Sequence, residues 1–75
     1  MATFRASANT IGDVLSAARA ALREAGVGEA RANAELLLAC LLRADRGGLL
    51  ARRRDPLDPG IAARYSSWVR RRASR

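Results

Sequence analysis

Residues 10–27, TIGDVLSAARAALREAGV, decide the fold of this chain. Their apolar members recur every three or four positions, which is the period of an amphipathic helix; they are Ile11, Val14, Leu15, Ala18, Ala21, Leu22 and Ala25. Thr10 stands at the N-cap position with Asp13 three residues later as a short capping-box partner. Gly26 follows the last periodic residue, and Val27 can fold back on the helix as in a Schellman ending. The stretch therefore predicts one helix with both ends marked.

A second helix is predicted over about residues 29–43, where apolar side chains surround most of the circumference. We expect it to be the central and most buried helix. Cys40 is interpreted as a small core residue, because the chain has no histidine that could activate a thiol. Asn33 and Glu35 interrupt the apolar run and are expected on an exposed polar edge, with Arg31 and Glu35 forming an i,i+4 pair.

Two further helices are marked by their N-caps. Asp45 predicts a cap for a short helix to about residue 53, weakened by two glycines near its start. Asp58 followed by Pro59 predicts the start of a fourth helix that runs to about residue 72.

The composition also favours helices. Of the 75 residues 49% are hydrophobic and 17 are alanine, whereas β-branched residues are scarce. The predicted fold class is all-α, a small four-helix orthogonal bundle with room for a fifth short turn. Tyr65 and Trp68 lie three residues apart in the apolar stripe of the last helix, so we interpret them as sealing a core edge; a stacking platform for single-stranded nucleic acid is the alternative.

Several kinds of site find no support in the sequence. One cysteine and no histidine leave no disulfide, zinc site or histidine base. The longest apolar run, residues 36–42, is far shorter than the roughly 20 residues that cross a bilayer. We expect no catalytic, cofactor-binding or metal-binding residue in this chain, no membrane partner, and a reducing, cytoplasmic location.

The charge is strongly basic. All fourteen basic residues are arginines, against seven acidic residues, giving a net charge of +7. The candidate partner-binding residues are Arg52, Arg53 and Arg54, the first arginine triplet, and Arg70, Arg71 and Arg72, the second arginine triplet. An acidic partner would suit these triplets. The alternative is that they line solvated helix ends, where they complement the helix dipole and keep a small protein soluble.

Three segments in order, TIGDVL at residues 10–15, LREAGV at residues 22–27 and EARANAELLL at residues 29–38, resemble the N-terminal domain of the HemK or PrmC methyltransferases. The resemblance continues through Asp45-Arg46, Leu49-Leu50 and Pro56-Leu57 to the closing Val69-Arg70-Arg71-Arg72. No single motif is diagnostic; their order is.

The resemblance implies a function. Members of that family methylate the side-chain amide of the glutamine in the Gly-Gly-Gln motif of peptide chain release factors, with S-adenosylmethionine bound by a C-terminal Rossmann-like domain. This chain would be the domain that helps to hold the release factor, without the catalytic half, because the Asn-Pro-Pro-Tyr motif and the glycine-rich cofactor loop are missing. The implied partners are a peptide chain release factor and the chain's own C-terminal methyltransferase domain.

The sequence pattern and the resemblance together give the expected boundaries. Residues 1–9 are expected to be a flexible tail, residues 10–72 the bundle, and residues 73–75 the start of a linker to a missing methyltransferase domain. Asn33 stands where the family usually has aspartate, and the usual Gly-Glu-Pro is absent because the sequence stops at Arg75, as truncation would produce. A free-standing basic nucleic-acid-binding protein and a purely structural accessory bundle are the alternative functions.

Overall fold

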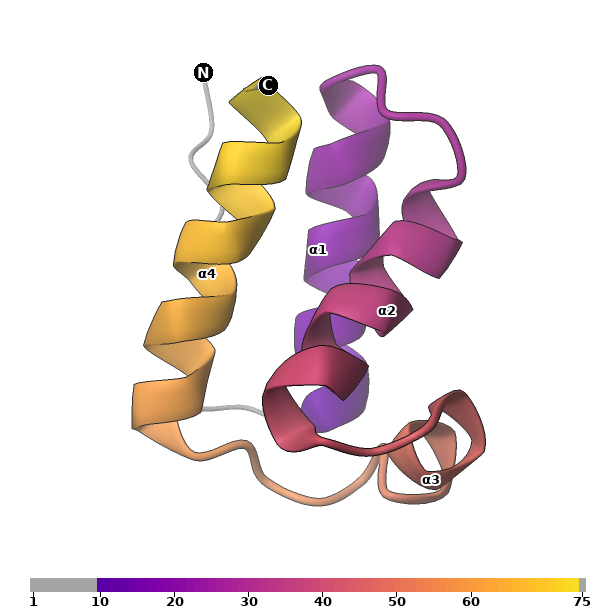
Figure 1. Ribbon diagram of the computed structural model, residues 1–75, viewed down its shortest axis with the longest axis vertical. Coiled ribbons are helices and arrows are strands. Elements are labelled where there is room, and N and C mark those ends of the chain that lie inside the picture. Colours follow the sequence, from indigo (N-terminus) through magenta and orange to yellow (C-terminus); the bar gives the residue numbers. More distant parts are fainter. Residues whose placement is uncertain (1–9, 75) are drawn as a thin grey trace.

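The computed structural model describes residues 10–74 and shows four helices (Figure 1). They are α1 (Ile11–Glu24), α2 (Ala30–Leu42), α3 (Arg46–Ala51) and α4 (Pro59–Ser74). Helices α1 and α4 run in the same direction, α2 runs back the opposite way, and α3 lies beyond the end where α2 finishes. Within residues 10–74 the chain forms no strand, so the predicted all-α, four-helix fold is confirmed. No helix in that range has the length and apolar character of a membrane span. The predicted tail, residues 1–9, lies outside the described residues.

Both ends of α1 follow the predicted capping chemistry. The Thr10 Oγ1 accepts a hydrogen bond from the Asp13 N–H at 3.2 Å. Gly26 has a φ of +81°, in the left-handed region that favours glycine. The N–H groups of Gly26 and Val27 then donate to carbonyls of the last turn, each at 3.0 Å, which is the bonding pattern of a Schellman motif.

The two predicted aspartate caps are also present. The Asp45 Oδ1 accepts from the Gly48 N–H at 2.6 Å at the start of α3. The Asp58 Oδ2 accepts from the Ile61 N–H at 3.1 Å at the start of α4. Each cap satisfies a backbone donor that a helix N-terminus leaves without an intrahelical partner.

The end of α4 differs from the prediction. The helix continues to Ser74 instead of ending near Arg72, because Ala73 is half-buried and packs against the core. Of the three residues expected to start a linker, Ala73 and Ser74 are helical, and Arg75 lies outside the described residues.

All four helices contribute to one core. Its largest fully buried side chains are Leu22 from α1, Leu38 from α2, Leu49 from α3, and Tyr65 and Val69 from α4. Burying each side chain of this size contributes about 1.5 to 3 kcal/mol relative to exposure. The bundle therefore depends on contacts among helices that are far apart in sequence.

Helix α2 packs against all three other helices, as expected of a central helix, but it is not buried all round. Leu36 is 59% exposed, and Cys40, predicted to lie in the core, is exposed as well. The prediction for Cys40 was wrong because the neighbouring helices cover only part of the apolar surface of α2. Its outward face remains in solvent.

Backbone hydrogen bonds join the start of α1 to the turn after α3. The Ile11 N–H donates to the Asp55 carbonyl at 2.9 Å, and the Gly12 N–H donates to the Arg53 carbonyl at 2.7 Å. A Cβ atom at residue 12 would lie 3.1 Å from the Arg53 carbonyl oxygen, so Gly12 permits this close approach. We call these two bonds the N-terminal clasp; they satisfy first-turn donors of α1.

Candidate functional site

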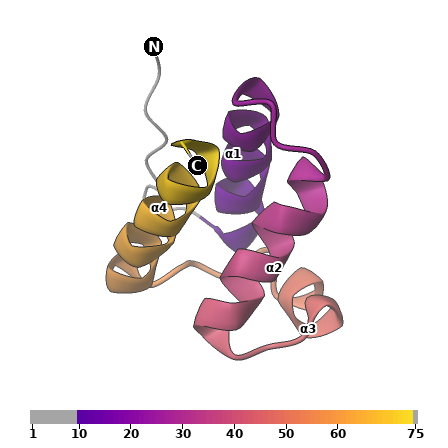
Figure 2. The ribbon, with the colours of Figure 1, turned by 45° about the horizontal axis from the view of Figure 1, so that its top comes forward.

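The two arginine triplets lie at opposite ends of the molecule. The first triplet occupies the turn that follows α3, whereas the second lies in the last turns of α4. Figures 1 and 2 show these two regions apart in both views, along the longest, 29 Å dimension of the bundle. The fold therefore does not join the predicted partner-binding arginines into one patch.

One triplet takes part in a groove between α2 and α4. This α2–α4 groove has a volume of about 730 Å³ and is lined by Val27, Gly28, Asn33, Leu37, Trp68, Arg71 and Arg72. Trp68, Arg71 and Arg72 share one face of α4, since they are three and four residues apart. The lining combines apolar side chains, an amide and two cations, and it includes no acidic residue.

Asn33 holds one wall of the groove in place. Its Nδ2 donates to the carbonyls of Gly28 and Glu29, each at 3.0 Å. Glu29 has a φ of 56°, in the left-handed region, and provides no side-chain cap for α2. The Asn33 amide thus fastens the loop before α2 to its first turn. It was predicted on an exposed edge and is instead half-buried with both amide hydrogens engaged.

The groove is electropositive. Within residues 10–74, neither the Arg71 nor the Arg72 guanidinium forms an ion pair with a carboxylate. Two adjacent, unneutralised cations beside apolar side chains create a local positive potential that attracts anions.

A second cavity, of about 290 Å³, lies between α1, α2 and the turn after α3. Arg19, Arg31 and Arg53 all line it, so one member of the first triplet joins arginines from other elements. Arg31 forms an ion pair with Glu35, whereas Arg19 and Arg53 have no ion-pair partner among the described residues.

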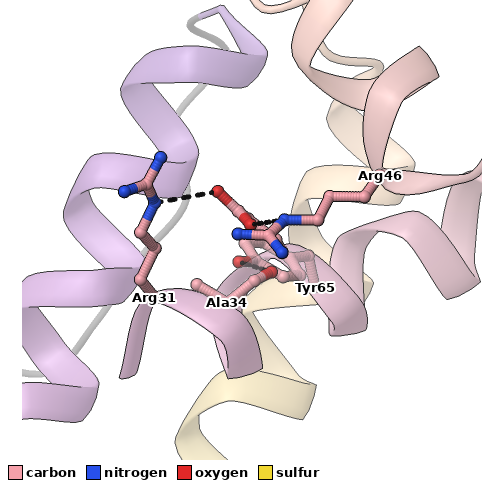
Figure 3. A network of polar contacts seen from close by, with 5 residues as sticks. Arg31, Ala34, Arg46 and Tyr65 are labelled. Atoms are coloured by element: carbon pink, nitrogen blue, oxygen red, sulfur yellow. Dashed lines mark hydrogen bonds and ion pairs between the residues drawn. The ribbon is translucent and has the colours of Figure 1, made fainter. Parts of the chain in front are cut away.

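Glu35 is buried rather than exposed, which corrects the prediction. Only 5% of the residue is accessible, and its carboxylate accepts from the Nε atoms of Arg31 at 3.4 Å and Arg46 at 2.5 Å. Figure 3 shows the two guanidinium groups reaching that carboxylate from opposite sides. The predicted pairing with Arg31 is confirmed, whereas the pairing with Arg46 on α3 was not predicted. The sequence signal was an acid inside an apolar helical run.

Tyr65 lies beside this ion network and serves the core. It is fully buried, and its hydroxyl donates to the Ala34 carbonyl at 2.8 Å (Figure 3). Burial, and to a smaller extent the Glu35 carboxylate, raises the pKa of the Tyr65 phenol above its ordinary value. Tyr65 therefore seals the core as predicted, whereas Trp68 is only half-buried and faces the α2–α4 groove.

The two cavities carry features that suit the binding of a partner. Among residues 10–74, no three side chains of the types that ligate metals come together. The two cavities offer positive charge, and the α2–α4 groove adds partly exposed apolar side chains next to it. Interfaces that recognise proteins commonly combine tryptophan and arginine in this way.

Comparison with known protein families agrees with this fold. The family model of the PrmC N-terminal domain matches residues 13–75, which includes α2, α3, α4 and nearly all of α1. No curated protein and no solved structure matches the chain. The match includes both arginine triplets and every residue that lines the α2–α4 groove. It confirms the resemblance found in the sequence, and the chain belongs to the PrmC N-terminal domain family.

Proposed function

We propose that this chain is the substrate-recognition domain of a protein-glutamine methyltransferase that modifies the Gly-Gly-Gln glutamine of peptide chain release factors. The observation that carries the proposal is the family match over residues 13–75. A domain of this kind contributes by binding the protein substrate away from the reacting amide, so that binding energy orients the glutamine.

The basic surface supports a role in binding a protein substrate. The residues of both arginine triplets are exposed, and positive charge at the surface attracts an acidic partner in the cytoplasm, where release factors act. We propose that the release factor contacts one of the two triplets, because they lie at opposite ends of the bundle.

The cofactor belongs elsewhere in the proposed enzyme. S-adenosylmethionine sites of the Rossmann-like type need a glycine-rich turn after a strand, and residues 10–74 form helices and no strand. We therefore assign no residue of this chain to the cofactor. Its binding is proposed for the chain's partner within the parent protein, a C-terminal methyltransferase domain.

Direct binding tests the proposal. The 75-residue chain is titrated with a purified peptide chain release factor, and separately with a single-stranded oligonucleotide, by isothermal titration calorimetry at low and at physiological salt. We expect saturable, one-to-one binding of the release factor that persists at physiological salt, because apolar contacts accompany the charges. Absence of that binding would refute the proposal.

The oligonucleotide arm tests a second candidate function, nucleic-acid binding, which the half-buried Trp68 beside Arg71 and Arg72 favours. Phosphate contacts release counterions, so affinity for an oligonucleotide falls steeply as salt rises. An oligonucleotide bound more tightly than the release factor at physiological salt would support this second function instead.

A further inference from the structure

We infer that the α2–α4 groove binds an acidic segment of the protein substrate that carries an apolar anchor side chain. The inference rests on the proposed function, since it takes the release factor as the source of that segment. It assigns the contact to the second arginine triplet and to the apolar side chains that line the same groove, which the sequence alone did not show to lie together.

Charge is the first reason. Arg71 and Arg72 both line the groove, no acidic side chain lines it, and no carboxylate within residues 10–74 pairs with either guanidinium. Two adjacent like charges repel each other, and carboxylates placed between them remove that repulsion while gaining charge-assisted hydrogen bonds. Cations in the last turn of α4 also complement its dipole, but that effect does not require apolar side chains beside them.

The apolar side chains are the second reason. Val27, Leu37 and Trp68 line the same groove and are each half-buried, so part of each apolar surface remains in water. An aliphatic or aromatic anchor from a partner would cover that surface, and contacts of this kind supply most of the affinity at protein interfaces. A purely ionic ligand would leave it exposed.

Shape is the third reason. A volume of about 730 Å³ is large enough for one anchor side chain together with flanking carboxylates. The hydrogen bonds from Asn33 to Gly28 and Glu29 fix the rim formed by the loop before α2. A fixed rim lowers the entropy lost on binding, which favours recognition of one segment.

A protein segment explains the groove better than nucleic acid does. A single strand needs a basic track that follows successive phosphates. The first arginine triplet lies at the opposite end of the bundle, so it does not form one continuous basic strip with Arg71 and Arg72 (Figure 2).

Matched arginine variants of the 75-residue chain test the inference. Arg71→Gln with Arg72→Gln removes two charges at the groove, and Arg52→Gln with Arg54→Gln removes two from the other end, so the net charge of +7 falls equally. All four positions are exposed, and circular dichroism checks that both variants keep their helices. Calorimetry with the release factor should show about a tenfold weaker affinity for the groove variant and less than about twofold for its control.

The fluorescence of Trp68, the chain's one tryptophan, provides a second readout. The probes are a tryptophan-free peptide of glutamates with one leucine, its glutamine-for-glutamate counterpart, and an oligothymidylate. We expect only the acidic peptide to change the emission, and Arg71→Gln with Arg72→Gln to abolish the change.

The outcomes separate the two proposals. Equal weakening of release-factor binding by both variant pairs, or none by either, would overturn the groove assignment and leave the proposed function standing. Binding of the acidic peptide at Trp68 without any binding of the release factor would support the groove's ligand chemistry but refute the proposed function. A response to the oligothymidylate alone would overturn the inference in favour of nucleic acid.

Discussion

Replacing Arg46 by alanine should destabilise the domain by about 2 kcal/mol, although local rules predict the opposite sign. Arg46 is the first residue of α3, where a cation opposes the helix dipole, and alanine has the higher helix propensity. The structure adds a charge-assisted hydrogen bond to Glu35, whose side chain is only 7% exposed. Hydrogen bonds to charged groups contribute about 1.5 to 3 kcal/mol to the free energy of unfolding, and a buried acceptor that loses its partner is destabilising.

The exposure of the arginines sets the size of the effect. The Arg46 side chain is 62% exposed, so the cost stays below the roughly 3 to 5 kcal/mol of breaking a fully buried pair. Arg31 is 65% exposed and lies farther from the carboxylate, at 3.4 Å, so Arg31→Ala should cost only about 0.5 kcal/mol.

Urea unfolding followed by circular dichroism measures these differences without adding salt. For a domain of this size, 2 kcal/mol corresponds to a melting temperature lower by about 8 to 16 °C. In a Glu35→Gln background the cost of Arg46→Ala should fall below about 0.5 kcal/mol, because the ionic partner is gone. An unchanged or higher stability of Arg46→Ala, or an equal cost in both backgrounds, would refute the role given to the ion pair.

Three further predictions concern the core and one helix end. The raised pKa of Tyr65, the one tyrosine, means that the free energy of unfolding should fall as pH rises above about 10. Above that pH the phenol of the unfolded chain loses its proton, whereas the phenol of the folded chain keeps it. Near-ultraviolet absorbance reports the ionisation of the phenol, and circular dichroism recorded on the same sample reports the loss of helix. Leu38→Ala should cost about 2 to 5 kcal/mol in urea unfolding, and Leu36→Ala, at an exposed position, about 0.5 kcal/mol or less. Arg43→Gly should raise the melting temperature, since Arg43 has a φ of 53°, a left-handed conformation that costs a non-glycine residue about 1 to 2 kcal/mol, of which the greater entropy that glycine loses on folding offsets about 0.5 to 1 kcal/mol.

Each of the three has an outcome that contradicts it. Phenolate absorbance appearing near pH 10 while the helices persist would contradict the burial of Tyr65. Equal losses for the two leucine variants would contradict the assignment of the buried face of α2. A lower melting temperature for Arg43→Gly would mean that the arginine side chain contributes more than its backbone conformation costs.

The helix starts could be predicted from sequence because capping is local. Thr10, Asp45 and Asp58 each accept a hydrogen bond from an N–H three residues later, so each cap is visible within four residues of sequence. The left-handed ending at Gly26 is local in the same way.

The buried face of α2 could not be predicted by these means. Its leucines are consecutive and carry no helical period, so the position of the neighbouring helices decides which of them are covered. The fate of Glu35 depends on Arg46, eleven residues away on another helix.

The candidate site required the tertiary structure for the same reason. Charge runs identified Arg71 and Arg72, but two of the apolar side chains that line their groove, Val27 and Leu37, come from the loop before α2 and from α2 itself. The separation of the two triplets follows from the placement of α3 and α4, which arginine spacing does not encode.

The N-terminal clasp makes the completion of α1 depend on the turn after α3, which is synthesised much later. A nascent polypeptide ending before Arg53 lacks the carbonyls that receive the Ile11 and Gly12 amides, so the start of α1 cannot complete its hydrogen bonding ahead of the turn after α3. The domain should therefore fold as one cooperative unit. First-turn amides of an isolated helix exchange rapidly with solvent, whereas those of Ile11 and Gly12 should exchange with deuterium only when the whole bundle opens.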